Sequence, residues 1–182
     1  MQTPTRTIGL GINNAQLSIY IENIPPLKQY LSLQTITALH SHDIYNIGQQ
    51  TGNHWRKIFN VYAKLIFEIG FCQHDTWQNF RDRQLLQDHS NESLIFSPPN
   101  FDKLNPAKIH IIMGRTYAKK LDIDTRCFWL SKDFAINEGK NLIISPYFDY
   151  RQLSNIKVIH LAKLIKKLGY DKTEKQSYEA LV

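Results

Sequence analysis

At 182 residues, with 42% apolar and 21% charged residues, a formal net charge of +6 and a pI near 9.3, the chain has the composition of a moderately basic globular protein. Two cysteines, Cys72 and Cys127, are too few for a cysteine-rich metal site and are expected to be buried thiols, and no apolar stretch approaches the roughly 18 residues of a membrane span. We therefore expect a cytoplasmic protein with no metal, no cofactor and no membrane partner. Its charge permits DNA or a nucleotide as a partner without requiring one.

The N-terminal third of the chain has one clear strand pattern. Apolar residues alternate with polar ones over residues 16–21 and predict a strand, which two prolines then end. A helix is predicted over residues 27–39, and another begins at Asp43, with Ser41 or His42 as a candidate cap. The stretch from Gly48 to Gly52 predicts a break.

The strongest helical pattern covers residues 54–69, where apolar side chains recur every three or four residues. Asn53 is suited to cap this helix and Gly70 to end it. A further helix is predicted over residues 76–86, with Thr76 as its cap.

The second half of the chain alternates apolar strands with helices. Strands are predicted over residues 94–96, 108–113 and 142–144, with a helix over residues 115–121 and a final helix from residue 155. This alternation predicts an α/β fold of one domain over residues 1–182: three layers, α/β/α, around a short, mostly parallel four-stranded sheet. Residues 1–14 and 170–182 are expected to be less ordered ends.

The loop after the last predicted strand is the first candidate site. Tyr147, Asp149, Tyr150 and Arg151 follow that strand closely, and ligands bind at the carboxyl ends of parallel strands. The rings suit stacking on a flat ligand, Arg151 suits a phosphate or carboxylate, and Asp149 suits hydrogen-bond recognition. The alternative is a folded loop in which Asp149 pairs with Arg151 and the rings fill the edge of the sheet.

Two other segments carry candidate ligand-binding residues. Asn53, His54 and Arg56 begin the strong helix, where free N–H groups suit an anion, although many helices begin in this way without a ligand. Asn100 ends a rigid Ser-Pro-Pro-Asn loop and could read a carbonyl and its neighbouring N–H, or could belong to a simple turn. The His-Ser-His-Asp run at residues 40–43 is better explained by a helix start than by a metal site.

The order of these landmarks resembles that of the uracil-DNA glycosylase superfamily. Its first motif is similar to residues 19–26, the helix start of its mismatch-specific branch resembles residues 52–58, and its later loops resemble residues 97–100, 111–121 and 145–147. The resemblance implies a glycosylase-like fold, in which Asn23 orients a water, Asn100 reads a base edge and Tyr147 or Tyr150 stacks on the base. The whole chain also resembles an uncharacterised bacterial protein family.

The departures from that superfamily fall on the chemistry. The loop after the first strand has Glu22 and Asn23 but no Asp, and Ser145 stands where the superfamily has its catalytic His. The sequence therefore favours a protein that binds a nucleobase, nucleotide or single-stranded nucleic acid, with weak or absent base excision, and leaves open whether it is an enzyme. The alternative is a non-catalytic domain that binds a protein through its aromatic loop. The oligomeric state is not predicted.

Overall fold

The computed structural model describes residues 6–70 and 72–169, and within these residues the strands form one eight-stranded sheet in the order β3-β1-β4-β2-β5-β8-β7-β6. The strands are β1 (Gly9–Gly11), β2 (Leu17–Tyr20), β3 (Ile36–Thr37), β4 (Glu92–Ile95), β5 (Ile109–Met113), β6 (Phe128–Trp129), β7 (Ala135–Asn137) and β8 (Leu142–Ser145). The α-helices are α1 (Lys28–Leu31), α2 (Asp43–Thr51), α3 (Asn53–Ile69), α4 (Trp77–Arg83), α5 (Arg115–Lys120) and α6 (Asn155–Lys167), and three short 3₁₀ helices are η1 (Phe101–Lys103), η2 (Asp124–Arg126) and η3 (Glu138–Lys140).

The centre of the sheet is parallel. Strands β4, β2, β5 and β8 are neighbours in this order and all run the same way, so their carboxyl ends lie at one edge of the sheet. The sheet is mixed because β1 runs antiparallel to β4 and the β6–β7 hairpin adds antiparallel strands beside β8. The chain passes from β2 to β4 on one side and then to β5 on the other, which makes the end of β2 a point where ligands commonly bind.

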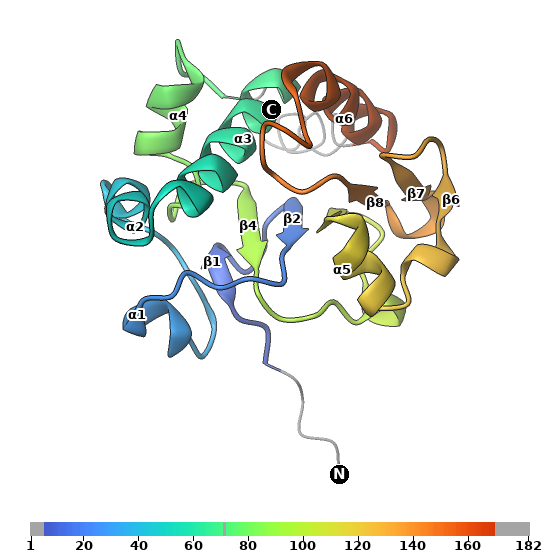
Figure 1. The fold of residues 1–182 in the computed structure, drawn as a ribbon, viewed down its shortest axis with the longest axis horizontal. Coiled ribbons are helices and arrows are strands. Elements are labelled where there is room, and N and C mark those ends of the chain that lie inside the picture. The colour runs from blue at the N-terminus through green and yellow to red at the C-terminus, as the bar shows by residue number, and fades with distance from the viewer. Residues whose placement is uncertain (1–5, 71, 170–182) are drawn as a thin grey trace, which may run out of the picture.

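Helices cover both faces of this sheet (Figure 1). Alternating side chains of the central strands point to opposite faces, so Ile111 packs in the core under α3 and α6 while Ile112 packs on the face covered by α5. The apolar stripe of α3 is buried almost completely, and Trp55 at its start is 3% exposed. No helix in the described residues is long and apolar enough to cross a membrane.

The predicted α/β class is confirmed, and the structure corrects several details. The sheet has eight strands in the described residues rather than four, because β1, β3, β6 and β7 are too short to show a pattern. The predicted helix over residues 27–39 is wrong: α1 ends at Leu31, and Ile36–Thr37 pair with β1 as strand β3. Asn53 is the first residue of α3 rather than its cap, whereas Thr76 caps α4 as predicted and Gly70 ends α3.

The expectation for the N-terminal end is also corrected. Gly9–Gly11 form β1 inside the sheet, in the stretch expected to be less ordered. The two glycines are required there, because a Cβ on Gly9 or Gly11 would lie 2.4 or 2.3 Å from a carbonyl oxygen of β4. Residues 170–182, the other expected end, lie outside the described residues. Cys72 and Cys127 are half-buried rather than buried.

Candidate functional site

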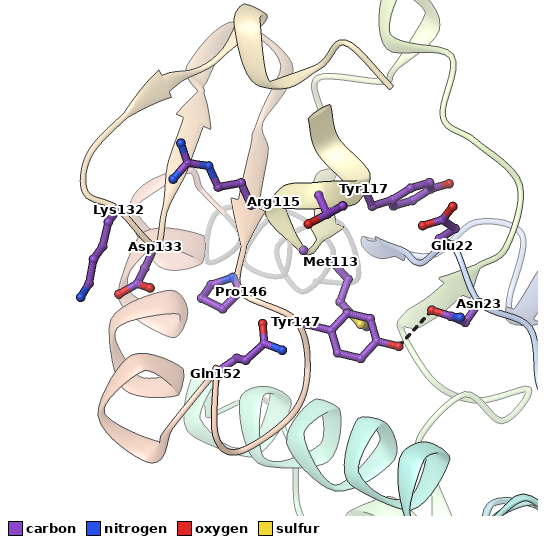
Figure 2. Close-up of a pocket in the computed structure, with 12 residues that line it drawn as sticks. Glu22, Asn23, Met113, Arg115, Tyr117, Lys132, Asp133, Pro146, Tyr147 and Gln152 are labelled. Carbon is purple, nitrogen blue, oxygen red and sulfur yellow. Dashed lines mark hydrogen bonds between the residues drawn. The ribbon is translucent and has the colours of Figure 1, made fainter. Parts of the chain in front are cut away.

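A cavity of about 290 Å³ lies at the carboxyl ends of β2, β5 and β8 (Figure 2). Its walls come from the residues that follow these three strands, together with the β6–β7 turn and the loop before α6. The residues that line it are Glu22, Asn23, Met113, Gly114, Arg115, Thr116, Tyr117, Lys132, Asp133, Pro146, Tyr147 and Gln152. The cavity therefore occupies the edge of the sheet where α/β proteins bind ligands.

Tyr147 connects three parts of the chain at this edge. Its hydroxyl donates to Oδ1 of Asn23 at 3.2 Å and lies 3.0 Å from Nε2 of His54 at the start of α3. Because the phenol has a single proton and gives it to Asn23, Nε2 of His54 is the donor in the second hydrogen bond. Burial, followed by the negative charges of Asp149 and Glu22, raises the pKa of Tyr147, so the phenol stays protonated at neutral pH.

Gly114 lies beside the Tyr147 ring. It follows β5 directly, has a φ of +100°, and a Cβ at this position would lie 3.5 Å from Cδ2 of Tyr147. The positive φ turns the chain sharply from β5 into α5, which an L side chain would oppose. A Cβ here would be in ordinary van der Waals contact with the Tyr147 ring, so the backbone conformation rather than lack of space requires glycine.

The two carboxylates of the cavity have cationic partners. Glu22 forms an ion pair with Lys120 of α5, and Asp133 forms one with Lys157 of α6 at 3.0 Å. Burial, with a smaller contribution from the charge of Glu22, also raises the pKa of Tyr117 to about 12. The acidic side chains of the cavity are therefore already compensated by the protein itself.

Two cations lie at the same cavity without a carboxylate partner. Within residues 6–70 and 72–169, neither Arg115 nor Lys132 forms an ion pair, and both are exposed. The guanidinium of Arg115 lies over the Trp129 ring, 4.6 Å from its centroid, which holds the side chain beside the cavity and leaves its N–H groups available.

The outer part of the predicted loop has a different environment. Asp149 accepts a hydrogen bond from the backbone N–H of Arg151 at 3.0 Å and pairs with Lys57 of α3 at 3.0 Å. The backbone N–H of Arg151, and then Lys57, lower the pKa of Asp149. The alternative of an Asp149–Arg151 side-chain pair is wrong, because Lys57 takes that place. Tyr150 is 55% exposed and lies 4.9 Å from the ammonium of Lys57.

The structure brings together only some of the predicted ligand-binding residues. Asn23, His54 and Tyr147 meet, and Asp149, Tyr150 and Arg151 lie on the outer side of the same loop. Asn53 and Arg56 bond to each other on the exposed surface and do not line the cavity. Asn100 is exposed and directly precedes η1, in which Asp102 pairs with Arg126, and it also lies outside the cavity lining.

Several residues of the cavity carried little signal in the sequence. Lys132 and Asp133 lie in the turn between β6 and β7, two strands of two and three residues that no periodicity reveals. Arg115 was predicted only as the first residue of the helix over residues 115–121, with no indication that it would line a cavity. Gln152 belongs to the predicted loop, and its place in the cavity depends on how that loop folds.

The position expected for a catalytic histidine offers no such group. Ser145 is fully buried at the end of β8, and its hydroxyl donates to the carbonyl oxygen of Pro146 at 3.0 Å. This hydroxyl faces the chain rather than the cavity, so it is not placed to protonate or stabilise a leaving group. Among the described residues, no group of three or more His, Cys, Asp or Glu side chains could hold a metal ion.

A family model described as a family of unknown function, DUF6942, matches residues 8–166. The chain belongs to this family. No curated protein and no solved structure gives a significant match. In the described residues, the matched range of the DUF6942 protein includes all strands and all helices, except for the last residue of α6. It also includes all residues that line the cavity. The cavity is therefore part of the region that defines the family model.

Proposed function

We propose that this DUF6942 protein binds a nucleobase-containing ligand in the cavity at the ends of β2, β5 and β8. The observation that carries the proposal is the meeting of an aromatic ring, Tyr147, with the amides of Asn23 and Gln152 at one cavity. An aromatic ring stacks on a flat base, and a carboxamide offers both a donor and acceptors to its hydrogen-bonding edge. A cavity of about 290 Å³ suits a small ligand of this kind rather than a large cofactor.

The test is titration of the full chain with nucleobases, nucleosides and single-stranded oligonucleotides at low salt, followed by calorimetry. Asn23→Ala and Gln152→Ala should each weaken binding about tenfold, the loss of one or two hydrogen bonds to the ligand. Asn91→Ala is the matched control, because Asn91 is exposed at the opposite edge of the sheet, before β4. Absence of binding by all three ligand classes would exclude the proposal.

We further propose that base excision is weak or absent. Asn23 lies at the cavity and could orient a water, as in the branches of the glycosylase superfamily that use Asn, but Ser145 offers no donor to the departing base. When the protein is incubated with DNA strands that contain uracil or hypoxanthine, the amount of free base released should not exceed the amount released by the Asn23→Ala variant. Release that depends on Asn23 would show instead that the protein is an enzyme.

The second candidate function is binding of a protein partner through the outer side of the loop. Tyr150 is 55% exposed and Arg151 lies 5.9 Å from its ring, and Tyr and Arg are the side chains that interface hot spots favour. The two functions differ in their sensitive residues. Tyr150→Ala should leave binding of a free base unchanged, whereas Gln152→Ala should weaken it.

A further inference from the structure

The proposed base-binding cavity has a second wall of different chemistry. Figure 2 shows Asn23 and the hydroxyl of Tyr147 on one side of the cavity, and Arg115 and Lys132 on the other. One end therefore offers the amide of Asn23 and the Tyr147 hydroxyl, Gln152 lies between the two ends, and the other end offers two cations beside Asp133. A ligand that satisfies both ends has a flat polar part and an anionic part.

The charge balance of the lining supports an anion at the second end. Glu22 and Asp133 are the carboxylates of the cavity, and each is paired with a lysine, Lys120 or Lys157. The two remaining charged residues of the lining, Arg115 and Lys132, have no ion-pair partner in the described residues. An arginine fork and a lysine ammonium are the groups that proteins use to hold phosphate.

The position of Arg115 is fixed by packing rather than by an acid. Its guanidinium lies over the Trp129 ring at 4.6 Å, so the side chain is held beside the cavity while its donors stay unpaired. A salt bridge would have required a ligand to break it before binding, and the stacked arrangement does not. We propose that the ligand is a nucleoside phosphate, a proposal that rests on the proposed function of this cavity. The base would lie against Asn23, Tyr147 and Gln152. The phosphate would be held by Arg115 and Lys132.

The experiment compares each of the common nucleosides with its 5′-monophosphate by calorimetry on the full chain at low salt. At least one monophosphate should bind about tenfold more tightly than its own nucleoside, the gain expected for charge-assisted hydrogen bonds. Arg115→Gln with Lys132→Gln should remove this gain and leave nucleoside affinity unchanged. Lys119→Gln, an exposed lysine of the same helix α5 that does not line the cavity, should preserve it.

Added salt and inorganic phosphate give independent measurements. Salt should weaken binding of the monophosphate and not of the nucleoside, because only the first depends on exposed charges. Inorganic phosphate should compete with the monophosphate alone. The variants are at exposed positions, and an unchanged melting temperature of Arg115→Gln and Lys132→Gln shows that any loss of binding is local.

The outcomes separate this inference from the proposed function. Nucleoside binding that depends on Gln152, with no gain from the phosphate or with a gain that survives Arg115→Gln and Lys132→Gln, would overturn the phosphate assignment and leave the base site standing. Absence of binding by nucleosides and monophosphates alike would overturn both. Binding of an oligonucleotide at least tenfold tighter than any monophosphate would show that the phosphates recognised belong to a strand, and would overturn the assignment to a free nucleotide.

Discussion

Tyr147 and Tyr150 lie three residues apart in one loop, yet they belong to different environments. Tyr147 is half-buried, hydrogen-bonded to Asn23 and His54, and lines the cavity. Tyr150 is 55% exposed and lies near the cationic groups of Lys57 and Arg151. Identical side chains in one short segment therefore face two surfaces, an inner one that lines the cavity and an outer one that is exposed to solvent.

The difference arises from the burial of Phe148, one of the two residues between them. Phe148 is fully buried and packs edge-to-face on Tyr62 of α3, with ring centroids 6.0 Å apart, and Leu153 is buried at the end of the loop. These two apolar anchors fix the loop, and the backbone direction then decides which tyrosine faces the cavity. Aromatic content alone did not distinguish a site residue from a surface residue.

The largest expected effect tests the anchor. Phe148→Ala should lower the free energy of unfolding by about 3–5 kcal/mol, the usual cost of removing a buried phenyl ring, whereas Tyr150→Ala should change it by about 0.5 kcal/mol or less. Chemical denaturation measures both. Equal losses for the two variants would show that the loop is not anchored by Phe148.

A smaller effect is expected at the strand end that supports the inner tyrosine. Gly114→Ala should cost about 1–2 kcal/mol because an L residue at this positive φ is strained, and relief of that strain would move a backbone that lines the cavity beside Tyr147. Gly70→Ala is a matched control: its φ is +91° and nothing lies within 4 Å of the added Cβ. Both variants should be destabilised in denaturation, and only Gly114→Ala should also weaken ligand binding. An equal loss of binding in Gly70→Ala would contradict this local effect.

The hydrogen bonds of the Tyr147 hydroxyl should contribute less to the free energy of unfolding than the glycine at position 114. Tyr147→Phe should lower the free energy of unfolding by about 0.5–1 kcal/mol, since the hydroxyl is lost but the exposed Asn23 and His54 can bond to water instead. Tyr45→Phe, at a residue of α2 that is 60% exposed, should have no measurable effect. Thermal melts of the two variants make the comparison, and a similar shift in both would mean that the Tyr147 hydroxyl bonds contribute nothing.

The smallest effect concerns the outer side of the loop. The pKa of Asp149 is lowered, so the interactions of its carboxylate stabilise the fold above the ordinary Asp pKa of about 3.9 and are lost as the pH falls through the folded value. Lys57→Gln should raise this pKa but leave it below the ordinary value, because the backbone N–H of Arg151 is the larger cause. Carboxyl NMR titration measures it. Lys64→Gln on the same helix is the control, and an equal rise there would point to general charge rather than to the Lys57 contact.

Long periodic segments made the fold class predictable. The alternation in residues 16–21, the apolar runs at 108–113 and 142–144 and the stripe of residues 54–69 each correspond to an element of the core. The predicted helix over residues 27–39 failed because pairing of Ile36–Thr37 with β1 overrides weak local helix preference. Strands of two or three residues have too few positions to show a period.

The sequence predicted where the candidate site would lie better than it predicted which residues would line it. The rule that ligands bind at the carboxyl ends of parallel strands predicted which edge of the sheet holds the cavity, and Asn23 and Tyr147 line that cavity. His54 reaches Tyr147 because α3 begins beside that edge, a tertiary fact that sequence spacing does not contain. Lys132 lies on the β6–β7 hairpin, which no sequence pattern predicted. Asn100 does not line the cavity.

The burial of Ser145 limits how this protein can change. Its side chain has no exposed surface at the end of β8, where Ser145 pairs with Met113 of β5. A Ser145→His substitution would place a larger side chain at this fully buried position and would disturb the adjacent Pro146–Tyr147 backbone. A proton donor at this strand end would therefore require a change in the loop that carries Tyr147 as well as at Ser145.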